Sequence, residues 1–399
     1  MVIDGAGVGA LPDAPEYHDE GSNTLGNLSR CFSGGLHLPN LGKLGLGNII
    51  SINGVPPTSG SSGSFGKCIE AGVGKDSTTG HWEIAGVITS TPFPLYPMGF
   101  PPEIISPFEM ATGREVLGNK PASGTEILKE LGDDHVATCR PIVYTSADSV
   151  FQIAAHEDVI ALSELYEMCE IARGLLTGQN KVSRVIARPF AGKSGAYKRT
   201  RHRKDYSVAA SSDTLLDIAQ GHNLATIGIG KTGDLFAHRG LSAEIYTANN
   251  QEGILATLIQ INEAPDGIIF TNLVDTDTIY GHRRDIAGFR GALEQFDHFL
   301  PKILKAMHEE DLLFITADHG IDPTKPGSDH TREYTPLLVY SPSRQGGVDL
   351  GIRESFADIA ATIADHFQID APGLAGTSFL SQLPRISNLQ IRRHSEEGA

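Results

Sequence analysis

Short, continuous apolar runs recur along the chain, and most of them end at a turn residue or an acidic residue. Runs of Ile, Val, Leu and Phe without polar alternation fit strands that are buried on both faces, as in a parallel sheet. The runs are residues 2–3, 141–145, 225–230, 267–274, 312–316 and 336–340. We therefore expect these segments to be strands of a mostly parallel sheet.

Between these runs, apolar residues recur at helical spacing. Steps of three and four residues place them on one face of a helix. The clearest series are Ile286, Phe289, Leu293, Phe296 and Leu300, and then Phe356, Ile359, Ala360, Ile363 and Phe367. Strands that alternate with helices predict an α/β fold, with a mostly parallel sheet flanked by helices.

Two stretches indicate domain crossings. Prolines cluster between residues 90 and 107, and a small polar stretch at 207–213 follows a basic run. The block between them has strand and helix signals of its own. We predict a core domain built from residues 1–91 and 212–384, and a smaller α/β domain, 92–211, inserted into it. Residues 385–399 are expected to be a flexible tail.

Composition and charge narrow the class of protein. The chain has 399 residues, of which 40% are apolar and 20% charged, which is typical of a folded protein. Its formal net charge of −16 repels phosphate backbones, so we expect no nucleic acid and no anionic membrane as partner. No obligate protein partner is evident.

The expected location is the cytoplasm. The four cysteines form no C-x-x-C pair, which is typical of reduced thiols. The first residues do not resemble a signal peptide, and no apolar run approaches the roughly 18 residues of a membrane span.

Aspartates and histidines cluster next to several apolar runs. Parallel strands end at one edge of a sheet, so these side chains are expected to converge there. Mixed carboxylate and imidazole ligands suit Mn or Zn better than Ca. A single Asp-His pair is more often a turn or a helix cap, but several in one chain predict a site for two metal ions. The candidates are Asp4, Asp275, Asp277, His282, Asp318, His319, Asp329 and His330.

The run Gly-Lys-Asp-Ser-Thr-Thr-Gly-His-Trp-Glu at residues 74–83 is a second candidate for chemistry. A hydroxyl near a helix start becomes a nucleophile when a metal ion deprotonates it. The competing interpretation is an ordinary helix cap. The pattern alone does not choose among Ser77, Thr78 and Thr79, and it lacks the spacing of a phosphate-binding P-loop.

Taken in order, these residues resemble the alkaline phosphatase superfamily. The resemblance rests on Asp4, the run at 74–83, Asp277 with His282, Asp318 with His319, and His330. Three further stretches, residues 118–126, 144–150 and 329–334, narrow the resemblance to the phosphopentomutase family. It extends from Asp4 to about Leu380. The chain departs from that family at its start, where only three residues precede Asp4 and Gly5 replaces the usual serine, so we expect a short first strand.

The resemblance implies an alkaline-phosphatase-like core with an inserted cap, and an isomerase that interconverts ribose or deoxyribose 1-phosphate and 5-phosphate. Thr79 matches the phosphorylated threonine. Two manganese ions are implied, together with a sugar bisphosphate activator. Asp277, His282 and His330 match the ligands of one ion, and Asp4, Asp318 and His319 match those of the other.

Substrate recognition is implied for four further residues. Asp148 lies in the match at 144–150, and Arg184 and Arg199 match arginines that hold a distal phosphate. Lys231 follows the run at 225–230 and is a further candidate to face the substrate, against the competing interpretation of a surface lysine. The rival functions are a related metal-dependent phosphatase or phosphoglycerate mutase, and a metal-binding protein without catalytic activity.

Overall fold

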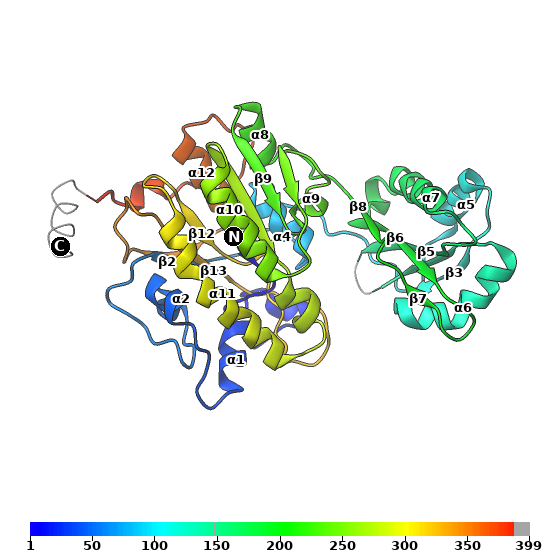
Figure 1. The fold of residues 1–399 in the computed structure, drawn as a ribbon, viewed down its shortest axis with the longest axis horizontal. Helices are drawn as coiled ribbons and strands as arrows, with labels where there is room; N and C mark the ends of the chain where they lie inside the picture. The colour runs from blue at the N-terminus through cyan, green and yellow to red at the C-terminus, as the bar shows by residue number, and fades with distance from the viewer. Residues whose placement is uncertain (147–148, 387–399) are drawn as a thin grey trace. The chain divides into compact units, whose positions relative to one another are not determined.

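The computed structural model describes residues 1–146 and 149–386. The chain divides into two units. The core unit contains Met1–Ser90 and the chain from Ala210 onward, and the smaller unit is the single stretch Thr91–Ala209. Figure 1 shows that each unit is a sheet with helices packed against it.

The core sheet is formed by two four-stranded parts, ordered β10-β9-β11-β1 and β12-β13-β2-β14. Its strands are β1 Val2–Ile3, β2 Ser64–Cys68, β9 Ala225–Ile229, β10 Ala243–Ile245, β11 Gly267–Leu273, β12 Leu313–Ile315, β13 Thr335–Tyr340 and β14 Asp349–Arg353. The two parts join where Val2 bridges Thr316 in parallel and the Ile3 amide donates to the Thr316 carbonyl at 2.8 Å. The first strand is short, as expected.

The predicted apolar runs all contain strands, but β13 runs against its neighbours. It pairs antiparallel with both β12 and β2, whereas the other pairings of the core sheet are parallel. The chain passes from β12 to β13 without a crossover helix, and such a direct return allows an antiparallel pair. The apolar pattern is the same for either direction, so it did not predict this reversal.

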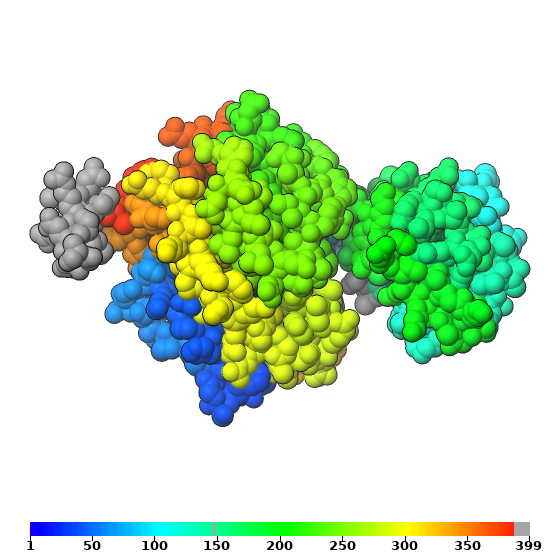
Figure 2. Space-filling view, viewed as in Figure 1, coloured from blue at the N-terminus to red at the C-terminus, as the bar shows by residue number. Residues whose placement is uncertain are grey.

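Helices cover both faces of the core sheet. α10 (Asn250–Glu263) packs on α11 (Ile286–Ala306), and the two form one continuous surface in Figure 2. Elsewhere on the core, α12 (Ala357–Phe367) contacts α4 (Ser77–Ile84) and α8 (Leu215–Gly221). The predicted apolar series of α11 is confirmed, because Phe289, Leu293, Phe296 and Leu300 are all buried. The remaining core helices are η1 Ala14–Tyr17, α1 Thr24–Arg30, α2 Pro39–Leu44, α3 Leu46–Ile49, α9 Thr232–Leu235, η3 Thr276–Gly281 and η4 Leu380–Gln382.

One edge of the core sheet gathers segments that are distant in sequence. The parallel strands β1, β11 and β12 end there, and β2 ends there before α4. Because β13 is reversed, it begins at the same edge. The segments that follow β1, β2, β11 and β12 therefore meet at this edge, together with the segment that precedes β13.

The smaller unit is a six-stranded mixed sheet with helices on both faces. The order is β3-β4-β5-β6-β7, and β8 also pairs with β6. Separate apolar clusters lie on its two faces. Its elements are α5 Pro102–Thr112, β3 Leu117–Pro121, α6 Gly124–Thr138, β4 Ile142–Thr145, β5 Val150–His156, α7 Leu162–Leu175, η2 Gly178–Asn180, β6 Arg184–Ala191, β7 Lys198–Arg199 and β8 Lys204–Ser207.

Within the described ranges, no helix is both long enough and apolar enough to cross a membrane.

Candidate metal centre

The predicted carboxylate and imidazole ligands converge at the sheet edge described above. Asp4 follows β1, Asp318 and His319 follow β12, and His330 lies ahead of β13. Asp277 lies in η3, a short π-helix directly after β11. Such π-helical turns are frequent at functional sites. Ligand atoms of Asp4, Asp318 and His319 lie within 4.8 Å of one another, as do those of Asp277, His319 and His330.

His282 joins the second of these groups. Its Nε2 lies 3.4 Å from Asp277 Oδ1 and 3.3 Å from His330 Nε2. His319 Nε2 lies between the two groups, 3.3 Å from Asp4 Oδ1 and 3.4 Å from Asp318 Oδ2. The rings of His319 and His330 stack with centroids 3.8 Å apart. All six residues predicted as ligands therefore lie in one cluster.

Backbone carbonyls set the tautomer of the three histidines. His282 Nδ1 lies 2.6 Å from the Ser328 oxygen, and His330 Nδ1 lies 2.7 Å from the Lys75 oxygen. His319 Nδ1 lies 3.1 Å from the Gly320 oxygen. A carbonyl only accepts, so each Nδ1 carries the proton and, in a neutral ring, Nε2 carries the lone pair. The three Nε2 atoms point into the cluster, as metal ligands require.

Buried oxygens in the cluster lack hydrogen-bond donors. Asp4 Oδ1, Asp277 Oδ1 and Asp318 Oδ2 are buried without a hydrogen bond, although imidazole nitrogens lie 3.1–3.4 Å away. Leaving such groups unsatisfied is costly, and carboxylate oxygens facing imidazole nitrogens form a suitable donor set for a transition metal. The residues present therefore fit divalent metal ions.

The charges of the cluster are strongly coupled. Burial raises the pKa of Asp4, and the Asp318 and Asp277 carboxylates raise it further. Burial opposes ionisation of Asp318, but His319, His81 and the Gly5 amide together outweigh it and hold the Asp318 pKa at about 2. His330 likewise holds the pKa of Asp277 below its ordinary value against the effect of burial. Burial disfavours charge on His319, yet the carboxylate of Asp318 raises the His319 pKa well above the usual range. The buried carboxylates of the cluster therefore favour a bound cation.

The run at residues 74–83 starts helix α4 beside this cluster. Asp76 is the N-cap, and its Oδ1 accepts from the backbone amides of Thr78 and Thr79 at 3.0 and 3.2 Å. The Thr79 hydroxyl donates to Asp76 Oδ2 at 2.8 Å, whereas Ser77 Oγ lies 3.0 Å from His319 Nε2. The helix cap is therefore Asp76 and not one of the three hydroxyl residues, and the Ser77 hydroxyl contacts a predicted ligand.

Gly80 allows α4 to lie directly on a ligand strand. A Cβ at this position would lie 2.1 Å from the Asp318 carbonyl oxygen and 3.0 Å from the Asp318 Cβ. No side chain fits there. The close approach couples the position of the helix to the position of Asp318.

Two of the candidate acidic residues have structural partners instead. Asp275 Oδ2 accepts from the Asn250 amide at 2.8 Å, at the start of α10. Asp329 forms an ion pair with Lys75 at 3.1 Å, and its side chain is 60% exposed. For these two residues the turn-or-cap interpretation is the better one.

The sequence analysis did not identify several residues that support the predicted ligands. Asn272 Nδ2 donates to Asp4 Oδ2 at 2.9 Å. The only available signal was its polarity near the end of the otherwise apolar run 267–274. Arg332 is buried and donates to the carbonyls of Glu70, Gly72 and Gly74, at 2.7–2.9 Å, ahead of α4. It therefore fixes the loop that leads into the helix.

Lys231 also lies next to the cluster. Its Nζ donates to Thr278 Oγ1 at 2.8 Å, and Thr278 Oγ1 in turn lies 3.4 Å from Asp277 Oδ2. This contact is compatible with a surface lysine and with a lysine that faces an anionic ligand. A cation at this place reinforces the positive charge available to an anionic ligand.

The smaller unit carries the predicted arginines on one sheet. Arg184 Nη1 lies 3.7 Å from Asp205, and Arg199 Nη2 donates to the Tyr144 hydroxyl at 3.3 Å. Arg188 was missed, although it lies four residues after Arg184 in β6 and so shares its face. Burial and the neighbouring arginines lower the Arg188 pKa to about 10, so it stays charged at neutral pH. Asp148 lies outside the described residues.

Comparison with known proteins places this geometry in context. A family model described as Metalloenzyme superfamily matches residues 1–371. A phosphopentomutase from Caldanaerobacter subterraneus is 56% identical over 96% of this chain and 97% of its own length. Phosphopentomutases from Dictyoglomus thermophilum and Dictyoglomus turgidum are 56% and 54% identical over the same shares of each chain.

Proposed function

The chain belongs to the phosphopentomutase family of isomerases, and from that premise we propose that it interconverts ribose or deoxyribose 1-phosphate and the corresponding 5-phosphate. The reaction proceeds through a phosphorylated Thr79 and a sugar bisphosphate intermediate. In this role the enzyme links nucleoside breakdown to pentose phosphate metabolism. The observation that carries the proposal is the convergence of six ligand residues beside the start of α4.

The metal ions in this proposal are two manganese ions. Asp4, Asp318 and His319 hold one, and Asp277, His282 and His330 hold the other. When bound, such ions neutralise phosphoryl oxygens and stabilise a leaving alkoxide. The convergence of the three Nε2 atoms and the buried carboxylate oxygens described above supports this assignment.

Thr79 is the proposed nucleophile. Its hydroxyl is buried at the first turn of α4, where Asp76 Oδ2 accepts its hydrogen bond. Asp76 therefore orients the hydroxyl. Ser77 is the nearest rival, because its Oγ contacts His319 Nε2.

The smaller unit is proposed as the substrate-recognition cap. Arg184 and Arg199 bind the phosphate that is not being transferred, because the guanidinium fork matches phosphate oxygens. Asp148 and Lys231 complete the proposed contacts to the sugar phosphate. Exclusion of water from the loaded site would suppress hydrolysis and separate a mutase from a phosphatase.

The first experiment compares wild type, Thr79→Ala and Ser77→Ala in converting ribose 1-phosphate to ribose 5-phosphate. Mn²⁺ and a catalytic amount of ribose 1,5-bisphosphate are supplied. We expect wild type to isomerise without releasing phosphate, and Thr79→Ala to lose at least about 10³-fold in kcat, because the covalent route is gone. Ser77→Ala keeps the nucleophile and serves as the matched control.

Three outcomes would count against the proposal. Release of inorganic phosphate by wild type would indicate a phosphatase. Loss of activity in Ser77→Ala with retention in Thr79→Ala would move the nucleophile to Ser77. Absence of turnover in a metal-loaded wild type would favour the metal-binding protein without catalytic activity.

A further inference from the structure

One face of the sheet in the smaller unit carries a row of polar side chains. The strand register places Tyr144, Gln152 and Ile186 side by side on β4, β5 and β6. Arg184 and Arg188 lie two residues before and after Ile186, so both arginines are on this face. The apolar cluster beneath α6 adjoins the row. The polar row is therefore the part of this face where a charged ligand finds partners.

Arg188 is half-buried on this face, and only one edge of its guanidinium is engaged. Its Nε donates to Oε1 of the buried Gln152 at 3.0 Å. In the described part of the chain, its two Nη groups have no hydrogen-bond acceptor, and Arg188 forms no ion pair. Gln152 thus holds the guanidinium while the other N–H groups stay available. A planar fork in this state suits a two-point contact to phosphate oxygens.

Arg199 approaches Arg188 from the neighbouring strand. β7 pairs antiparallel with β6, and Phe190 stands opposite Arg199. Arg188 lies two residues before Phe190 on the same face, so Arg188 and Arg199 are diagonal neighbours. Such positions are about 7–8 Å apart, which long side chains can bridge. The two guanidinium groups can therefore contact one ligand.

Tyr144 adds a buried hydroxyl next to Arg199. This hydroxyl accepts from Arg199 Nη2 at 3.3 Å, and among the described residues its own proton has no acceptor. Gly124 at the start of α6 leaves room for the pair, because a Cβ there would lie 1.3 Å from Arg199 Nη2 and 2.7 Å from the Tyr144 hydroxyl oxygen. A phenol donor and a guanidinium thus lie together near Arg188.

Positive charge exceeds negative charge among the described residues of this face. Arg203 and Arg184 lie 2.5 and 3.7 Å from the Asp205 carboxylate. Arg188 and Arg199 have no such carboxylate in the described ranges. Burial, with the charges of Arg203 and Arg199, lowers the pKa of Arg188. An anionic ligand between Arg188 and Arg199 would relieve this repulsion.

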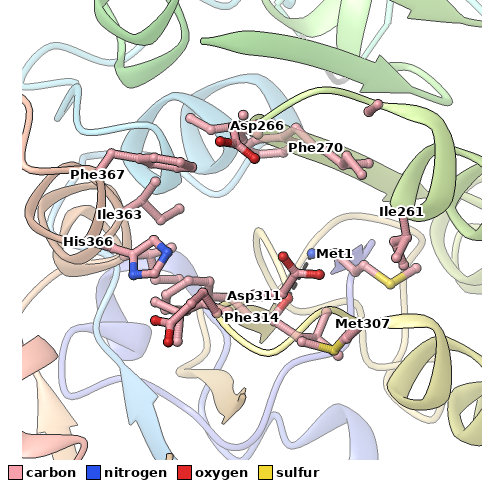
Figure 3. A pocket seen from close by; sticks show the side chains of 18 of the residues that line it. Met1, Ile261, Asp266, Phe270, Met307, Asp311, Phe314, Ile363, His366 and Phe367 are labelled. Atoms are coloured by element: carbon pink, nitrogen blue, oxygen red, sulfur yellow. Dashed lines mark hydrogen bonds between the residues drawn. The ribbon is translucent and has the colours of Figure 1, made fainter. Parts of the chain in front are cut away.

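A cavity of about 580 Å³ in the core unit offers no comparable site. It is lined mainly by apolar residues, with acidic side chains among them (Figure 3). Its two arginines are already engaged, because Arg344 donates to the Leu383 carbonyl and Arg385 pairs with Glu310. The unengaged N–H groups of Arg188 therefore distinguish the sheet of the smaller unit.

We propose that Arg188, together with Arg199 and the Tyr144 hydroxyl, binds the phosphate that is not being transferred. The guanidinium fork of Arg188 contacts two oxygens of a phosphate monoester dianion, and Tyr144 donates its proton to a third. This inference rests on the proposed function, because it identifies further contacts to the same sugar phosphate. It adds two residues that the resemblance did not supply.

The first test needs no substitution. Wild type loaded with Mn²⁺ is treated with phenylglyoxal, which modifies arginines, with and without saturating ribose 5-phosphate, and the modified residues are mapped by mass spectrometry. We expect the sugar phosphate to slow modification of Arg188 and Arg199 at least about fivefold, because their N–H groups become engaged. Arg201 is exposed and has no hydrogen bond or ion pair in the described chain, so its modification should not change. Equal modification of Arg188 with and without ribose 5-phosphate would overturn the proposal.

A matched pair of variants measures the contact. Arg188→Met and Arg201→Met remove the same charge from the smaller unit. Calorimetry with ribose 5-phosphate should show a Kd at least about tenfold higher for Arg188→Met and less than about twofold higher for Arg201→Met. Arg188→Lys should recover only part of the affinity, because an ammonium group lacks the planar fork. Equal weakening in Arg188→Met and Arg201→Met would indicate a general effect of charge and would overturn the proposal.

The outcomes separate this inference from the proposed function. Wild type that shows protection of Arg188 by ribose 5-phosphate but does not isomerise it would retain the phosphate contact and overturn the proposed function. Wild type that isomerises the substrate while Arg188 stays unprotected, and while Arg188→Met binds as tightly as wild type, would retain the function and overturn the contact.

Discussion

At the scale of single residues, Gly80 is the position where we expect substitution to be tolerated least, because α4 there contacts the segment after β12 that contains Asp318. A Cβ at Gly80 would lie 2.1 Å from the Asp318 carbonyl oxygen, and neither backbone can yield without moving a ligand. We expect Gly80→Ala to lower kcat at least about tenfold, to weaken Mn²⁺ binding and to destabilise the core by about 1–3 kcal/mol.

Gly291 provides the control for this substitution. It lies inside α11, and a Cβ there would meet nothing within 4 Å. Gly291→Ala should leave activity unchanged and stabilise the protein by about 0.5–1 kcal/mol. Steady-state kinetics, metal titration and urea unfolding of both variants make the comparison. Wild-type activity in Gly80→Ala would show that the contact does not position the site.

Asp205 makes a second prediction at this scale, one of pH dependence. Burial raises its pKa, but Arg203 and Arg184 outweigh this and hold the pKa below the ordinary 3.8. A depressed carboxyl pKa adds stability above the unfolded pKa, and that stability is lost as the pH falls through the folded pKa. Asp205→Asn should therefore cost about 1–2 kcal/mol at pH 7, a value discounted because Arg203 is partly exposed.

The difference between Asp205→Asn and wild type should shrink as the pH falls below about 3.9. Urea unfolding of the full chain at pH 7, 5 and 3.5 measures it. Asp213→Asn, which breaks an exposed ion pair with Arg239, should change stability by less than about 0.5 kcal/mol. A penalty for Asp205→Asn that is constant with pH would contradict the electrostatic origin.

At the scale of elements, the reversed direction of β13 explains why the connection between β12 and β13 supplies predicted ligands at both of its ends. Asp318 and His319 leave β12, and His330 comes shortly before β13 begins at the same edge. The apolar runs predicted both strands, because a strand that is buried on both faces is apolar along its whole length. They could not predict the direction of β13, because a continuous apolar run has the same pattern in a parallel and in an antiparallel strand.

Other contacts, which hold the site in place, could not be predicted from the sequence for a different reason. Arg332 holds the loop before α4 through backbone carbonyls, and any residue type supplies a carbonyl. Asn272 supports Asp4 across 268 residues of chain. The ligand types follow from local patterns and from the resemblance, whereas partners that act on backbone atoms or over such separations follow only from the fold.

At the scale of the whole molecule, metal ions would tie together segments that are distant in sequence. We expect removal of metal by a chelator to lower the melting temperature of the core unit, and Mn²⁺ to restore it. Free metal at 100 times its Kd would add about 2.7 kcal/mol. Calorimetry of wild type and Asp277→Asn, with and without Mn²⁺, measures the effect. An unchanged wild-type transition after chelation would contradict a bound metal in the folded core.

The place of β1 in the core sheet also has a consequence for the order of events during synthesis. Val2 pairs with Asn272 on one side and bridges Thr316 on the other. The ribosome adds about 5–20 residues per second, so the first strand waits about 15–60 seconds for its neighbours. Asp4 is therefore made well before the strands that fix its place. The ions can therefore load only after nearly the whole core has been translated.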